Sequence, residues 1–463
     1  MTDIPEGDYV KHSRLLFCIV ISGLWFSACQ PSAVRETVEM HPAAEKEMID
    51  AARYAIDRAN TPEEGSALLQ KLAGLYVRYN RIDDALEIID AMPVGETRDA
   101  LIADIGVHYA ATGSPERALE AAEGMESSYH ASRARAAVAV AYEEAGEYGK
   151  GRALAESISD PHFQAQAFAG IGVVYYNEGY PDLASRLFRQ ALQAAEREGS
   201  ITHRIGTITE VAVLYRKAGQ TGPARELFNR AIDLTESIGN DRFIPEMWSM
   251  LLSRYRDAGL DDEVVRRAER AAGGLAGASG FYRDQLYGSI AGAYAGLGRF
   301  DDAESIAGNI RDAGVRSNAF SGIAAAAAKH NDPDQAHRFF NGAIEATDSI
   351  QSETFRNRAL RDIALSAKET GAIDIVARST ELITDPIYRG EVIVALAGFR
   401  FRENDRDEGE AQLSRALRIV AGASERRAPS DVFITIAFLY DHAGIEPDEE
   451  TRLLVSKVLH SLE

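Results

Sequence analysis

Glu143 and Glu144 form the most conspicuous carboxylate pair in this 463-residue chain, and paired carboxylates are the groups with which glycosidases cleave sugars. Adjacent side chains on a helix point about 100° apart, however, so the two cannot face one bond. We therefore expect both on a solvated face. The sequence also lacks a His-Glu-x-x-His motif, a Gly-Lys-Ser/Thr phosphate loop and a nucleophile elbow. It predicts a protein that is not an enzyme and has no cofactor or metal site.

Cys29 is the second residue that could carry chemistry. Lys11 and Arg14 precede a short apolar stretch (15–26), which is too short to span a bilayer, and Ser-Ala-Cys follows it (27–29). No cysteine follows Cys29, as expected in an oxidising compartment. These features indicate a secretory signal. The alternative is an uncleaved first helix that stays buried.

The order Phe26-Ser27-Ala28-Cys29 resembles the lipobox of bacterial lipoproteins, in which leucine is usual at the position of Phe26. The resemblance implies a signal peptide over 1–28, acylation of Cys29 and a polar spacer over 29–43. Gln30, after the cysteine, favours the outer membrane by the same resemblance. We expect a protein of the bacterial cell envelope that faces the periplasm and contacts the membrane through its lipid only.

The elements that would position any site come from a repeat. Tyr76, Tyr109, Tyr142 and Tyr175 lie 33 residues apart, and each follows a small residue by three positions. The frame extends to eleven units, spaced by 33 residues at some steps and by 39 or 40 at others. Its reference positions are Ala73, Gly106, Ala139, Gly172, Ala212, Leu252, Ala291, Ala324, Ala364, Ala397 and Ala437. A period of this length predicts a solenoid of stacked helix pairs.

Within one unit, apolar residues fall at offsets of three and four along two helices that a turn residue separates. The pattern in the fourth unit is Gly172, Tyr175, Gly179, Ala184, Phe188 and Ala191. These positions resemble the tetratricopeptide repeat (TPR). The resemblance implies an all-α, right-handed α-solenoid of about eleven TPR-like helix hairpins over 44–463. The turn position holds Gly in eight units and Asn in three, which predicts a left-handed backbone there.

Three further expectations follow from this frame. The recurring tyrosine should pack inside its own hairpin rather than bind a ligand. The longer spacings should share their extra residues between the second helix of one unit and the first helix of the next, which would make a taller wall from about residue 180 onward. A capping helix should cover 44–59, and a last helix should cover 447–462.

Ligands of TPR proteins lie along the concave wall of first helices, so the resemblance implies a site there. The residue directly after each small residue, such as Val107, Val140 and Val213, is mostly small and apolar. The local cluster of basic and aromatic residues on this wall is Tyr176, Asn177, Arg216, Lys217 and Arg256. We expect it to bind an acidic or extended peptide. The alternative is a set of solvated charges without a ligand.

A second basic group, with acidic neighbours that could pair with it, consists of Arg358, Arg361, Lys368 and Arg402. The net charge of -21 argues against nucleic acid as a partner, because binding there depends on Lys and Arg. The leading hypothesis is a non-catalytic protein–protein interaction scaffold, lipid-anchored in the envelope, that serves outer-membrane, pilus or cell-wall assembly. The alternatives are a glycan- or peptidoglycan-acting enzyme, or its regulator, on a helical superhelix, and a cytosolic TPR scaffold with a misread amino terminus.

Overall fold

The computed structural model describes residues 40–45, 47–238, 243–257, 262–274, 280–423 and 430–463, without the side chains at 256, 257, 262 and 263. The predicted signal peptide, Cys29 and most of the predicted spacer lie outside these residues. All described residues belong to one compact unit, 39–463. None of its described helices is long and apolar enough to cross a membrane.

Within the described ranges the chain forms one short 3₁₀ helix and 23 α-helices, and no strand. They are η1 (Pro42–Glu45), α1 (Met48–Asp57), α2 (Pro62–Arg78), α3 (Ile82–Asp90), α4 (Glu96–Ala111), α5 (Pro115–Glu123), α6 (Ser128–Glu144), α7 (Lys150–Ser157), α8 (Pro161–Asn177), α9 (Pro181–Glu196), α10 (Ile201–Lys217), α11 (Thr221–Glu236), α12 (Ile244–Asp257), α13 (Asp262–Gly274), α14 (Gly280–Gly296), α15 (Phe300–Gly308), α16 (Ala313–Lys329), α17 (Pro333–Thr347), α18 (Glu353–Glu369), α19 (Ile373–Leu382), α20 (Pro386–Arg402), α21 (Arg406–Ala423), α22 (Ser430–His442) and α23 (Glu449–His460).

The eleven predicted repeats are eleven helix hairpins, from α2 and α3 to α22 and α23, preceded by the capping helix α1. Every predicted small position falls in an even-numbered helix. The turn residues have the predicted left-handed backbone, with φ of +86° at Gly179 and +58° at Asn331. Gly259, the turn residue of one unit, lies outside the described residues. The all-α solenoid of TPR-like hairpins is confirmed.

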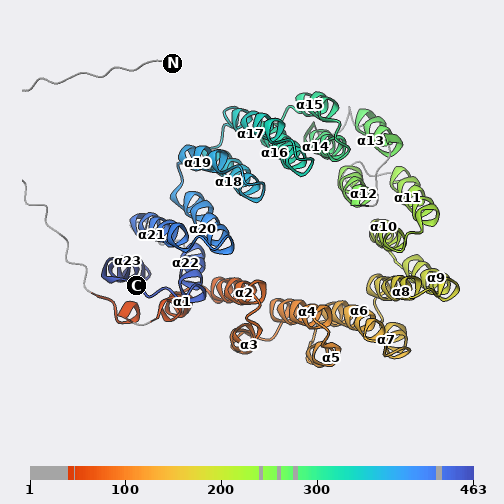
Figure 1. The fold of residues 1–463 in the computed structure, drawn as a ribbon, viewed down its shortest axis with the longest axis horizontal. Helices are drawn as coiled ribbons and strands as arrows, with labels where there is room; N and C mark the ends of the chain where they lie inside the picture. The colour runs from red at the N-terminus through yellow and green to blue at the C-terminus, as the bar shows by residue number, and fades with distance from the viewer. Residues whose placement is uncertain (1–39, 46, 239–242, 258–261, 275–279, 424–429) are drawn as a thin grey trace, which may run out of the picture. The chain divides into compact units, whose positions relative to one another are not determined.

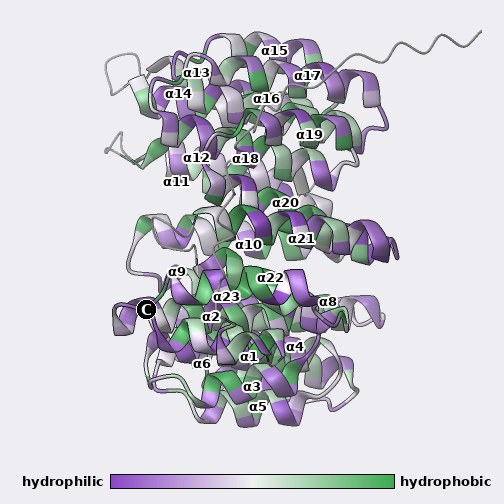
Figure 2. Ribbon diagram, turned by 90° about the vertical axis from the view of Figure 1, so that its left-hand side faces the viewer, coloured by the Kyte–Doolittle hydropathy of each residue, from purple (hydrophilic) through white to green (hydrophobic). Residues whose placement is uncertain are grey.

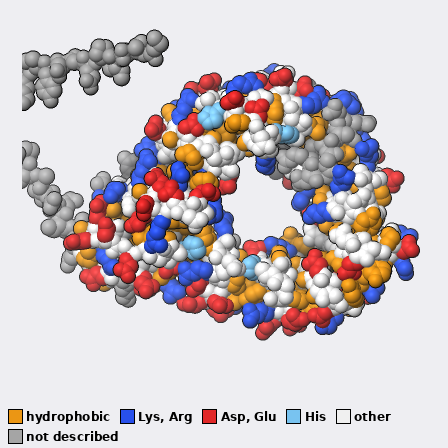
Figure 3. Space-filling model, viewed as in Figure 1, with side chains coloured by type: hydrophobic (Ala, Val, Ile, Leu, Met, Phe, Trp, Pro, Cys, Tyr) orange, Lys and Arg blue, Asp and Glu red, His pale blue; other side chains and the backbone are white. Residues whose placement is uncertain are grey.

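The hairpins form two layers. In Figure 1 the even-numbered helices from α2 to α22 make an inner layer, and the odd-numbered helices from α3 to α23 lie outside them. Each inner helix packs on the next, and α22 packs on α2 and α1, so this unit closes on itself. Figure 2 shows hydrophobic and hydrophilic residues alternating along individual helices, as amphipathic helices require. Figure 3 shows an opening at the centre, bordered in part by Lys and Arg.

The closure joins the two ends of the unit through a continuous apolar core. Tyr76 of α2 and Phe438 of α22 meet edge to face, with ring centroids 5.2 Å apart, inside a cluster that contains residues of both ends. Arg81 forms ion pairs with Asp84 and, from the other end of the chain, with Asp441. The backbone N–H of His41 donates to Ser456 Oγ at 2.8 Å, so the folded unit begins within the predicted spacer. The repeat pattern did not predict this closure.

The extra residues of the longer repeats lie in the outer layer alone. The outer helices α3, α5 and α7 have 9, 9 and 8 residues, whereas α9 and α11 have 16 each. Inner helices α2, α6, α8 and α10 have 17 residues throughout. The expected sharing between layers, and the taller inner wall, are therefore wrong. Each inner helix packs against inner helices on both sides. Additional residues at the end of an outer helix leave this packing between inner helices unchanged.

The recurring residues form the core, as predicted. A Cβ on Gly172 would lie 3.3 Å from the ring of Phe188, which covers this position. Phe188 in turn stacks on Tyr215 of the next hairpin, with centroids 3.9 Å apart. The recurring tyrosines are buried except for Tyr109, which is half-buried. Their rings hold the hairpins together and are not available to a ligand.

Candidate peptide-binding groove

The structure separates the side chains of the predicted peptide site. Lys217, the last residue of α10, is exposed on the inner face, whereas Arg216 donates to Thr221 Oγ1 at 2.7 Å beside the hairpin turn. Tyr176 is partly buried against the core, and Asn177 is exposed at the end of α8. The side chain of Arg256 lies outside the described residues. Of the five, Lys217 lines a cavity of the inner layer.

That cavity, here called the inner groove, has a volume of about 480 Å³ and crosses α4, α6, α8, α10 and α12. Its lining comprises Val107, Arg133, Ala136, Ala137, Val140, Gln166, Gly170, Glu210, Val213, Leu214, Lys217 and Arg254. Val107, Val140 and Val213 occupy the position directly after the small residue of three different units. The repeat frame thus identified the apolar floor of the groove.

The polar side chains of the groove stand on the same helix faces as the floor. Arg133 and Val140 are seven residues apart, two helical turns, and so project from one face of α6. Gln166 has the position in α8 that Arg133 has in α6, six residues before the small residue. Sequence reasoning missed Arg133, Gln166 and Arg254, although a search at this offset in every unit could have found the first two.

The charge of the groove is positive. Three cations and one carboxylate line it. Glu210 accepts from Arg254 Nη2 at 3.4 Å and from Gln166, while Arg133 pairs with Asp104 outside the lining. For the exposed Lys217 ammonium, no hydrogen bond or ion pair to a described residue is recorded. An unpaired ammonium above an apolar floor suits a carboxylate carried by an extended chain.

Two members of the second basic group, Arg361 and Lys368, pair with their own acidic neighbours. Arg361 donates to Asp362 and Glu391 at 2.8 and 2.9 Å, and Lys368 lies 2.8 Å from Glu369. These cations have partners within the chain. The ion pair of Arg361 with Glu391 joins α18 to α20, whereas the pair of Lys368 with Glu369 lies within α18.

Glu143 corrects the expectation of a solvated carboxylate pair. Its side chain is 0% exposed, whereas Glu144 is exposed. Glu143 Oε1 accepts from the backbone N–H of Gly149 and of Arg152 at 3.1 and 3.0 Å, and Oε2 accepts from Tyr175 Oη at 2.8 Å. The carboxylate therefore joins α6, the start of α7 and α8. These three hydrogen bonds join helices of the fold. The spacing of apolar residues along the sequence does not reveal them.

No protein-family model matches this sequence, and no curated protein matches it. Solved structures with a similar chain path include a circular tandem repeat protein with 14% identity, covering 90% of this chain and 93% of the other, with a TM-score of 0.23. The Bacillus subtilis aspartyl phosphate phosphatase F is 9% identical, covering 73% and 96%, with a TM-score of 0.28.

A third similar structure is the Pyrococcus horikoshii signal transduction ATPase with a tetratricopeptide repeat sensor. It is 13% identical over 80% of this chain and 65% of the other, with a TM-score of 0.23. At such scores the superpositions carry no argument about function. The hairpins themselves, each with its small residue and left-handed turn, give this chain the architecture of a TPR-like repeat protein.

Proposed function

We propose that this protein is a non-catalytic interaction scaffold that holds an extended, acidic segment of a partner protein in the inner groove. The observation that carries the proposal is the ammonium of Lys217, which pairs with no described residue and lines a groove with a valine floor. Apolar side chains of the segment would cover the valines, while a carboxylate would bind Lys217. Glu210 holds Arg254 and Gln166 in place along the same groove.

The length of the groove suits an extended chain. Its lining comes from five successive inner helices, which present their side chains at regular intervals along the inner layer. Adjacent packed helices lie about 8–10 Å apart, so a strand crossing several of them meets a new pair of side chains at each helix. A segment of several residues fits this spacing better than a single charged group.

The test is crosslinking in cells followed by mass spectrometry, with Lys217→Glu and Arg254→Glu as the groove variants. Both should lose crosslinks to acidic segments, because each places a carboxylate where the partner needs a cation. Lys329→Glu is the matched control, since Lys329 has the same place in its unit and is exposed outside the groove. An unchanged set of crosslinked partners in both groove variants would rule out this site.

We also propose that the scaffold is anchored through an acyl chain on Cys29 and works in the bacterial envelope, in outer-membrane, pilus or cell-wall assembly. The support is the sequence order 26–29 and the lack of later cysteines. Radiolabelled palmitate should enter the wild-type protein and not Cys29→Ala, and globomycin should block processing of the precursor. Equal labelling of both proteins would exclude this anchor and favour a cytosolic scaffold.

A further inference from the structure

The inner helices expose large apolar side chains at one rim. Because each inner helix is followed by an outer helix that returns, all inner helices run in the same direction and start at the same rim. Exposed apolar residues at or beside these starts are Val94, Tyr129, Ile201, Phe243, Phe281, Phe355 and Ile387. Exposed apolar side chains that gather in one place mark interaction sites, and three of these residues, Tyr129, Phe243 and Phe281, line two adjoining cavities. The residues at the start of α12 and α14 also line cavities.

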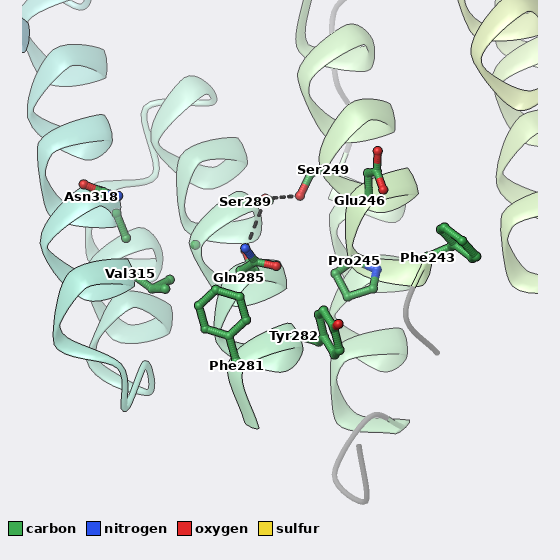
Figure 4. Close-up of a pocket in the computed structure, with 12 residues that line it drawn as sticks. Phe243, Pro245, Glu246, Ser249, Phe281, Tyr282, Gln285, Ser289, Val315 and Asn318 are labelled. Carbon is green, nitrogen blue, oxygen red and sulfur yellow. Dashed lines mark hydrogen bonds between the residues drawn. The ribbon is translucent and has the colours of Figure 1, made fainter. Parts of the chain in front are cut away.

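Two cavities meet at the start of α12 and are here together called the rim groove. Their volumes are about 730 and 570 Å³, and Phe243 and Glu246 line both. Figure 4 shows the larger one, where Phe281 and Tyr282 project from the start of α14 and Phe243 and Glu246 from the start of α12. The smaller cavity continues towards α6 through Met247, Met250 and Tyr129.

The rim groove offers anchoring sites for apolar side chains. Phe281 is 48% exposed, Phe243 39% and Tyr129 52%, although aromatic side chains gain most when they are buried. Met247 and Met250 line the smaller cavity with Tyr129 and Phe243, and methionine adapts its shape to different apolar partners. A chain with one or two large apolar side chains would cover these groups.

The charge of the rim groove is opposite to that of the inner groove. No Lys or Arg is among the described residues that line either cavity. Glu246 is exposed, stands in the first turn of α12, where the helix dipole favours its negative charge, and has no recorded ion pair within the described chain. The other two carboxylates are engaged: Asp160 caps α8, and the buried Glu198 accepts from Thr207.

We propose that the rim groove binds a basic segment of a partner protein, with an aromatic or aliphatic side chain between Phe243 and Phe281 and a Lys or Arg at Glu246. The negative charge of Glu246 favours a basic segment over an acidic one. A bilayer with anionic lipids would also accept exposed aromatic residues, but Glu246 and the net charge of -21 repel it. The rim groove and the inner groove have no lining residue in common.

The test uses two fluorescein-labelled synthetic peptides of identical apolar sequence, flanked either by Lys or by Glu, and fluorescence anisotropy with the full-length chain. All measurements use a Lys217→Ala background, which lacks the cation that would hold the Glu peptide in the inner groove. In this background the Lys peptide should bind about tenfold more tightly than the Glu peptide, as close charge pairs at interfaces allow. Glu246→Lys should reverse this preference, and Phe281→Ser should weaken binding of the Lys peptide by about tenfold. Glu381→Lys and Phe355→Ser are the controls, because these exposed residues lie outside both cavities.

Equal affinity of the Lys217→Ala background for the two peptides would overturn the proposal, as would equal losses in Phe281→Ser and Phe355→Ser. Binding to vesicles of anionic phospholipid that requires Phe281, without peptide binding, would assign the rim to a membrane surface and also overturn it. Lys217→Ala, which removes the cation without adding a carboxylate, should leave the affinity for the Lys peptide unchanged from wild type. That result separates the rim groove from the inner groove, so either site can fail without the other.

Discussion

The hairpins from α2 to α7 and those from α8 to α11 build the same inner layer with different outer helices. The outer helices of the first group have 8 or 9 residues and those of the second have 16. Inner helices of both groups have 16 or 17 residues. Repeat length therefore does not decide the height of the binding surface. It decides how much apolar cover the outside of each hairpin receives.

The short hairpins compensate with a different link to the next unit. Two of the short outer helices, α7 and α19, end at a buried residue in extended conformation, Ile158 and Ile383, which are 2% and 0% exposed. A buried polar side chain of the inner helix then binds the link: Asp284 accepts from the N–H of Arg311 and of Asp312. In the long α10/α11 hairpin, the position that Asp284 has in α14, seven residues before the small residue, holds Ile205, which is fully buried. The short α14/α15 hairpin thus relies on a buried polar contact where the long α10/α11 hairpin relies on apolar packing.

The sharpest test of this difference is Glu143→Ala, in a short hairpin. The substitution leaves the N–H groups of Gly149 and Arg152 and the hydroxyl of Tyr175 without their acceptor in a buried place, and it opens a cavity. We expect a loss of about 3–5 kcal/mol in the free energy of unfolding, measured by urea denaturation. Glu144→Ala, next to it and exposed, should change stability by less than about 0.5 kcal/mol. Equal effects of the two substitutions would contradict the structural role of Glu143.

A smaller loss is expected from Asp284→Ala. The backbone N–H groups of Arg311 and Asp312 would lose an acceptor at 3.0 and 2.8 Å, which should cost about 1.5–3 kcal/mol. Amide hydrogen exchange should accelerate at those two residues first. Asp301→Ala, an exposed residue of α15, is the control and should change neither quantity. Unchanged exchange in Asp284→Ala would show that the link is held by packing, as in long hairpins.

The sequence predicted the features that recur and missed those that depend on one unit. Small residues, tyrosines and the left-handed turns at Gly179 and Asn331 were predicted because each obeys a backbone or packing constraint that every unit shares. Glu143 was assigned to solvent, since periodicity describes the face of a helix and not a polar contact between three helices. The pairing of Arg81 with Asp441 was also missed. This ion pair forms only because each hairpin is rotated slightly relative to the one before it, and these rotations together bring α22 back to α2. The sequence of a single repeat does not show the size of that rotation.

Of the candidate site, the sequence predicted the floor and one cation. Val107, Val140 and Val213 follow from the frame, and Lys217 was included in the predicted cluster. Arg216 directly precedes Lys217 in α10, so its side chain points about 100° away from that of Lys217. It donates to Thr221 beside the hairpin turn instead. Whether a residue lines the groove depends on the direction in which its side chain leaves the helix. Proximity in sequence to another lining residue does not decide it.

Alkaline pH should expose the polar link of the short hairpins. Burial, together with the hydrogen bond to Glu143, raises the pKa of Tyr175 to about 12. The unfolded chain loses this proton near pH 10, so the stabilisation is complete below about pH 10 and is lost as pH rises towards about 12. Tyr175→Phe should remove part of this decline in unfolding free energy. Tyr215→Phe should remove less of it, because burial raises the pKa of Tyr215 without the carboxylate hydrogen bond that also raises the pKa of Tyr175.

The smallest effects should come from the turns, which the two kinds of hairpin share. Gly146 of a short hairpin and Gly179 of a long one have φ of +78° and +86°, a region that alanine enters at a cost of about 1–2 kcal/mol. Nothing lies within 4 Å of a Cβ built on either glycine, so backbone strain alone sets the cost. Gly146→Ala and Gly179→Ala should therefore destabilise the chain equally in urea denaturation, and Asn331→Gly should change stability by less than about 0.5 kcal/mol. A clearly larger loss at Gly179 would mean that the length of the outer helix strains the turn, and that the two kinds of hairpin differ in more than their outer layer.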